Sequence, residues 1–125
     1  MAYVLAFDFG LRHIGVAAGQ TVTRTASPVA TLRARDGKPD WPELTKLVAE
    51  WNPARLLVGL PLNMDGTESE MSERARRFAA ELARRTGRPT DLVDERLTTR
   101  AATEAGGTHP HAAALIAETW LNDHR

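Results

Sequence analysis

The chain has 125 residues, of which 42% are hydrophobic, and its 16 basic residues balance 16 acidic ones. This length suits one domain over residues 1–125, and the zero net charge gives no overall attraction to nucleic acid or to acidic lipid. The lack of cysteine excludes disulfides and thiolate chemistry, and no stretch resembles a signal peptide or a membrane span, so we expect a soluble cytoplasmic protein.

Three strands are expected in the first part of the chain. Residues 3–8 form a continuous apolar run of strand formers, which is typical of a strand covered on both faces. Residues 13–19 and 22–32 indicate two further strands joined by a short polar turn, most simply an antiparallel meander with the first. Pro28 within the third strand predicts an edge position or a bulge, because proline has no N–H to donate.

Helices and strands alternate in the rest of the chain. The predicted elements are a loop at 33–40, a helix at 41–51 capped by Asp40, a buried strand at 55–61, a long helix at about 70–85, a strand at 90–95, and two shorter helices at 98–105 and 110–122. Strands that alternate with helices are normally parallel. The sequence therefore predicts an α/β fold with a mixed sheet, a three-strand antiparallel meander plus two parallel strands, flanked by helices.

Acidic residues stand where two of these strands end. Asp8 ends the first strand, and Asp94 and Glu95 end the last one. Ligands of open α/β sheets bind beyond the carboxyl ends of the parallel strands, so carboxylates from distant parts of the chain can meet there. Such oxygen ligands suit Mg²⁺ or Mn²⁺, which support phosphoryl transfer. A lone acidic residue at a strand end is often only a turn or capping residue, so the pair Asp8 and Glu95 is more informative than either alone.

Four stretches of the sequence carry a resemblance to a known family. They are LAFDFGLRHIGVAAG, LLVGLPLNMDGTESEMSERARRFAAEL, VDERLTTRAA and AAALIAETWL. In this order and spacing the chain resembles the YqgF family, RNase H-fold proteins related to Holliday junction resolvases and described as nucleases for the 5′ end of pre-16S rRNA. The resemblance implies an RNase H-like fold and a two-metal, carboxylate-dependent phosphodiesterase. It puts Asp8 on the first catalytic aspartate of the family and Glu95 on the glutamate of its Asp-Glu-Arg motif.

The third metal position departs from the family pattern, in which an aspartate opens the last helix. Counting back from Glu118 puts His109 in the place of that aspartate, with His111 two residues further on. Two interpretations stay open. Histidine binds divalent ions through a neutral ring nitrogen, so either histidine could complete a site that prefers Mn²⁺ over Mg²⁺. Alternatively, the site is degraded and both histidines are ordinary residues near a helix N-terminus.

Basic and aromatic residues give further candidates for substrate contacts. Arg12 follows Asp8 closely in the sequence, and Arg96 and Arg100 come just after Glu95, so these three arginines are candidate phosphate contacts. Asn63 is a fourth substrate-binding candidate. The long helix carries more arginines, but glutamates interleave with them and favour surface ion pairs. The tryptophans fall on apolar helix faces, so we expect core packing rather than base stacking from Trp41, Trp51 and Trp120.

The leading hypothesis is a nuclease for structured RNA, with pre-16S rRNA as the substrate that the resemblance implies. Asp8, Glu95 and His109 would hold Mg²⁺ or Mn²⁺, and the protein would act as a monomer or weak homodimer. A Holliday junction resolvase-like DNA endonuclease is the second interpretation. A non-catalytic nucleic-acid-binding factor with a degraded metal site is the third, and metal binding together with cleavage of RNA, DNA and junction substrates separates the three.

Overall fold

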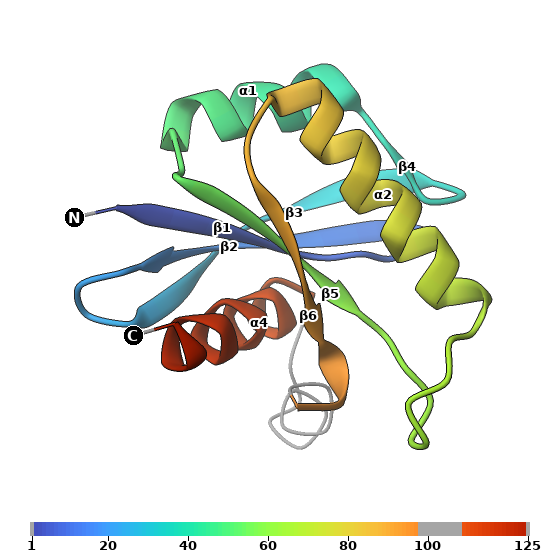
Figure 1. Cartoon of the computed structure of the whole chain (residues 1–125). Helices are drawn as coiled ribbons and strands as arrows, with labels where there is room; N and C mark the ends of the chain where they lie inside the picture. The colour runs from blue at the N-terminus through green and yellow to red at the C-terminus, as the bar shows by residue number, and fades with distance from the viewer. Residues whose placement is uncertain (1, 98–108, 125) are drawn as a thin grey trace.

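The computed structural model describes residues 2–97 and 109–124. Within these residues, six strands form one sheet in the order β4-β3-β2-β1-β5-β6 (Figure 1). The strands are β1 (Tyr3–Asp8), β2 (His13–Gln20), β3 (Thr25–Arg35), β4 (Lys38–Pro39), β5 (Arg55–Leu60) and β6 (Thr90–Asp94). The helices are α1 (Trp41–Trp51), α2 (Glu70–Thr86), α4 (His109–Asp123) and the short 3₁₀ helix η1 (Glu95–Leu97). The helix predicted at 98–105 lies outside the described residues.

The sheet is mixed, as the alternation of elements predicts. β1 lies in the middle, antiparallel to β2 on one side and parallel to β5 on the other. β3 continues the antiparallel meander, and β6 continues the parallel half. The carboxyl ends of β1, β5 and β6 therefore lie at the same edge of the sheet.

Helices cover both faces of the sheet (Figure 1), with α1 and α2 on one face and α4 on the other. Alternate residues of β1 show this division. Leu5 and Phe7 pack into the core beneath α1 and α2, whereas Val4 and Ala6 pack into the core beneath α4. All four are buried, which explains why the strand is apolar without alternation.

The ends of the meander differ from the prediction in two places. β3 begins at Thr25 rather than at residue 22, because residues 21–24 form the turn after β2. Farther along, the chain folds back through Asp36 and Gly37, both at positive φ (51° and 80°), and forms the short strand β4 where a loop was expected. Asp-Gly is a hairpin signal, but a two-residue strand is too short to show a hydrophobic period.

Pro28 lies at an irregularity in the sheet, as predicted. The pairing of β2 with β3 shifts between Val16 and Ala17, which face Ala30 and Pro28 respectively. Val29 is therefore an extra residue in β3, a β-bulge. The missing N–H of Pro28 falls where the regular pairing is already interrupted.

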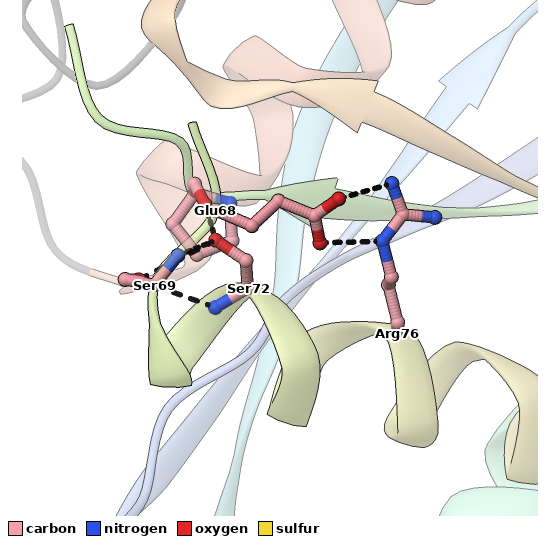
Figure 2. A network of polar contacts seen from close by, with 5 residues as sticks. Glu68, Ser69, Ser72 and Arg76 are labelled. Carbon is pink, nitrogen blue, oxygen red and sulfur yellow. Dashed lines mark hydrogen bonds and ion pairs between the residues drawn. The ribbon is translucent and has the colours of Figure 1, made fainter. Parts of the chain in front are cut away.

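A polar network fixes the N-terminus of α2 (Figure 2). The Ser69 hydroxyl accepts a hydrogen bond from the Ser72 backbone N–H at 3.4 Å, while the Ser72 hydroxyl accepts one from the Ser69 N–H at 2.9 Å. Ser72 is fully buried and also donates to the carbonyl of Pro61. Glu68 and Arg76 form a two-pronged ion pair with N···O distances of 2.7 and 3.0 Å. These contacts fix the loop between β5 and α2.

The tryptophans pack as the sequence predicts. Trp41 stacks on Phe78 beneath α2, and Trp51 meets Tyr3 edge to face. Trp120 packs against the core beneath α4, and its indole N–H donates to Asp91 at 3.2 Å. Within residues 2–97 and 109–124, no helix is long and apolar enough to cross a membrane.

Candidate active site

Two carboxyl groups meet at the edge of the sheet where the parallel strands end. Asp8 is the last residue of β1, with a side chain that is 17% exposed, and Glu95 follows directly after β6. β5 lies between these two strands, and the Glu95 side chain passes over Gly59 of β5. A Cβ atom on residue 59 would overlap Glu95 Oε1. Glycine at this position therefore lets the two carboxyls come together.

The environment of Glu95 favours its neutral form. Burial, the negative charge of Asp8, a hydrogen bond to Asp8 and the charge of Asp94 together raise the pKa of Glu95 to about 8. The protonated Glu95 carboxyl donates to Asp8, because this hydrogen bond stabilises the neutral acid. Two carboxyls held in contact in this way are typical of functional sites, where a proton or a cation offsets the repulsion between them.

His109 joins the pair from α4, on the same face of the sheet as the Glu95 side chain. It is the first residue of α4, and its Nδ1 lies 3.1 Å from Asp8 Oδ2 with the ring half exposed. The start of α4 lies directly against Gly15 of β2, where a Cβ atom would overlap the backbone carbonyl of His109. Asp8 thus contacts two other predicted site residues, Glu95 and His109.

His13 is a neighbour of this site that the sequence reasoning missed. Its exposed ring stacks on His109, with ring centroids 5.7 Å apart. The available signal was its place two residues before Gly15 in the same strand, since alternate residues of a strand share a face. His111 forms no hydrogen bond or ion pair with any residue that the structure describes.

The predicted substrate contacts have different surroundings. Arg12 is exposed, and its guanidinium has no ion pair or hydrogen bond among the described residues. Arg96 instead binds both oxygens of Asp94 at 2.7 to 3.1 Å, so its charge is already balanced. Asn63 donates to Thr67 Oγ1 at 2.9 Å within its own loop. Arg100 lies outside the described residues.

Four of the five arginines of α2 form surface ion pairs, as the interleaved glutamates predict. The pairs are Arg74 with Asp36 and Glu70, Arg76 with Glu68, and Arg84 and Arg85 with Glu81. Hydrogen bonds from Arg84 and Arg85 lower the pKa of Glu81 to about 2. These ion pairs balance much of the positive charge of α2, whereas the exposed Arg77 has no ion pair among the described residues.

The donor set at the sheet edge fits a divalent cation. Asp8 and Glu95 supply oxygen ligands of the kind that Mg²⁺ and Mn²⁺ prefer, and a cation would favour the ionised form of Glu95. His109 is a third donor, although its Nδ1 is engaged with Asp8. Over residues 2–97 and 109–124, no three such side chains converge as a ready-made metal cluster. The carboxyl pair is therefore the centre of the candidate site.

The chain is similar to known proteins over nearly its whole length. A family model described as "RuvX: Holliday junction resolvase" matches residues 2–123. A protein of Nitrosococcus oceani named "Putative pre-16S rRNA nuclease" is 47% identical over 96% of this chain and 86% of its own. A protein of Chromohalobacter salexigens with the same name is 50% identical over 96% and 89%.

A solved structure shares the fold. Thermus thermophilus RuvC, in complex with a Holliday junction substrate, superposes with a TM-score of 0.66 over 99% of this chain and 96% of its own, at 13% identity. The RNase H-like fold expected from the sequence is thereby confirmed.

Proposed function

This chain belongs to the RuvX family, and from that premise we propose that it is a divalent-cation-dependent nuclease that processes the 5′ end of pre-16S rRNA. The relatives named above support the substrate, since they are nearly half identical over almost their whole length. The reaction is hydrolysis of a phosphodiester bond. We place this activity in the cytoplasm, where a precursor of bacterial ribosomal RNA is found.

The contact between Asp8 and Glu95 is the observation that carries the proposal. Two carboxyls are held together in a partly buried site at the carboxyl edge of the sheet, and one of them has a pKa of about 8. Placing like charges together destabilises a fold unless a ligand compensates. Glu95 is neutral while it keeps its proton, and a bound cation would offset the charge of the pair once that proton is lost.

Each residue of the site has a distinct role in this proposal. Asp8 and Glu95 hold the cation, and Glu95 must lose its proton to do so. His109 orients Asp8 through Nδ1 and is the third donor available to the cation. When bound, Mg²⁺ or Mn²⁺ lowers the pKa of water and offsets the charge on the scissile phosphate.

The test is cleavage of an RNA that spans the 5′ end of pre-16S rRNA, with Mg²⁺ or Mn²⁺ and with EDTA as a blank. We expect Asp8→Asn to reduce cleavage to the EDTA background while leaving the melting temperature near that of the wild type. Asp123→Asn is the matched control, because it makes the same chemical change at the far end of α4. Cleavage by Asp8→Asn at the wild-type rate would refute the proposal.

Junction cleavage is the second candidate, favoured by the description of the family model. A four-way DNA junction therefore belongs in the same assay. Cleavage of the junction without cleavage of the RNA would replace the proposed substrate but keep the carboxyl site. Binding of Mn²⁺ in calorimetry without cleavage of either substrate would instead favour a non-catalytic binding factor.

A further inference from the structure

We propose that the β3–β4 hairpin binds the phosphodiester backbone of the RNA strand beside the active site. Three exposed cations form this surface, Arg33, Arg35 and Lys38, which we call the hairpin cations. None of them forms an ion pair or side-chain hydrogen bond with any described residue. The inference rests on the proposed function, because it concerns how the substrate of the same site is held.

The sheet register places the hairpin cations on the face of the active site. Arg33 lies directly opposite His13 in the antiparallel pairing of β2 with β3, and directly opposed residues point to the same face. His13 stacks on His109, which contacts Asp8. A row of side chains thus leads from the carboxyl pair outward to Arg33.

The row continues along the hairpin. Arg35 shares the face of Arg33 because strand residues alternate, and Lys38 lies opposite Arg35 in β4. The two arginines are about 6.6 Å apart along the strand, which lets each bind a different phosphate. Arginine and lysine contacts to phosphate give affinity without regard to base sequence.

The hairpin cations are not covered by the helix on this face. α4 begins against Gly15 and ends near Gly19, where Leu121 packs, so it runs away from the hairpin. In the register, Gly15 lies opposite Thr31, so Arg33 and Arg35 lie beyond the start of the helix. Figure 1 shows the hairpin that ends in β4 projecting past the N-terminal end of α4.

The acidic residue of the hairpin does not cancel this positive charge. Asp36, at the tip, is paired with Arg74 of α2 at 3.2 Å. Arg12, in the loop after β1, is tied to the hairpin, because its carbonyl accepts a hydrogen bond from the Ala34 N–H at 2.8 Å. Its exposed guanidinium has no ion pair or hydrogen bond among the described residues. The local balance is therefore positive although the chain as a whole is neutral.

The hairpin is also held rigidly relative to the carboxyl pair. The Gly37 backbone N–H donates to the Leu11 carbonyl at 2.9 Å, and a Cβ on residue 37 would lie 2.8 Å from the ring of Phe9, the residue after Asp8. The loop after β1 thus supports the hairpin. A surface fixed in this way loses little conformational entropy when it binds a strand.

The test is binding of a fluorescein-labelled oligouridine RNA, followed by anisotropy in EDTA so that no cleavage occurs. For single strands, the logarithm of the binding constant falls by about 0.7 per phosphate contact for each tenfold rise in salt concentration. Each contact therefore contributes about fivefold in affinity per tenfold fall in salt. We expect Arg33→Glu combined with Arg35→Glu to weaken binding at 0.1 M salt by roughly 25-fold and to lower the slope by about 1.4. The neutral pair Arg33→Gln and Arg35→Gln should act in the same direction, and circular dichroism verifies the fold of each variant.

The matched control is Arg24→Glu combined with Lys46→Glu, which changes the net charge equally at exposed residues of the β2–β3 turn and α1. We expect this control to bind within about twofold of the wild type. Equal weakening by both pairs, or wild-type affinity in the Arg33 and Arg35 variants, would overturn the inference. So would displacement of the RNA by millimolar inorganic phosphate, because a multi-contact surface favours the polymer.

If the chain is not a nuclease, the experiments give a different pattern from that expected if only the hairpin inference is wrong. In that case no divalent cation supports RNA cleavage, whereas the loss of affinity in the Arg33 and Arg35 variants persists. Cleavage that persists with unchanged affinity in those variants overturns only the inference about the hairpin cations.

Discussion

The carboxyl pair predicts an unusual dependence of stability on pH. Replacing Glu95 by glutamine keeps the size of the side chain and a group that donates to Asp8, but it removes the titration. We therefore expect Glu95→Gln to match the wild type in stability near pH 5 and to exceed it near pH 8.5.

The sign and size of this stability difference follow from the raised pKa of Glu95. Between its ordinary value of 4.5 and about 8, the folded protein holds a proton that the unfolded chain has lost. Stability due to this group is therefore complete below pH 4.5 and is lost progressively as the pH rises to about 8. At about 1.4 kcal/mol per pH unit, this interval corresponds to at most about 5 kcal/mol.

The assay is urea unfolding of both proteins from pH 4.5 to 9 in EDTA. Other groups contribute to each curve, so the quantity to compare is the difference in unfolding free energy between the two proteins. Glu50→Gln, which makes the same substitution at an exposed residue of α1, is the matched control. Addition of Mn²⁺ at pH 8.5 should stabilise the wild type and not Glu95→Gln.

One result would refute this reasoning directly. If the wild type and Glu95→Gln lose stability in parallel as the pH rises, Glu95 does not carry a proton that depends on folding. Repulsion between the two carboxyls would then give no support for a bound cation.

Two further predictions concern the residues around the site. Gly59→Ala should displace Glu95, since its Cβ would overlap Oε1, and calorimetry should show Mn²⁺ binding at least tenfold weaker than in the wild type; wild-type affinity would contradict this geometry. Phe78→Ala should lower the unfolding free energy by about 3 to 5 kcal/mol in urea, because the ring is buried against Phe7 and Trp41. A loss below about 1 kcal/mol would mean that the core beneath α2 collapses around the gap.

Much of the fold could be predicted because its signals are local. The apolar run at residues 3–8 identifies a central strand, Asp40 and Gly87 mark helix ends, and Pro28 marks the bulge. The carboxyl pair could also be predicted, because parallel strands end at one edge of a sheet and each of the two strands ends in an acidic stretch. All three residues proposed as ligands can therefore be selected from the sequence, and their role as ligands stays a prediction.

The remaining features depend on register and on side-chain partners. Arg33 faces the active site only because the extra residue at Val29 shifts the pairing, and a shift of one residue reverses the face of every later side chain. Pro28 predicts a bulge but does not show that Val29 is the extra residue. Similarly, the sequence shows Arg96 next to a glutamate, but it does not show that Asp94 balances its charge.

The contact of α4 with Gly15 has a consequence for how the chain can vary in length. The helix begins where its backbone meets the sheet, so the position of His109 is determined by this contact rather than by the number of residues that precede it. Loop-closure entropy changes only slowly with loop length, by about 0.6 kcal/mol per doubling. Insertions or deletions between Leu97 and His109 should therefore leave His109 beside Asp8.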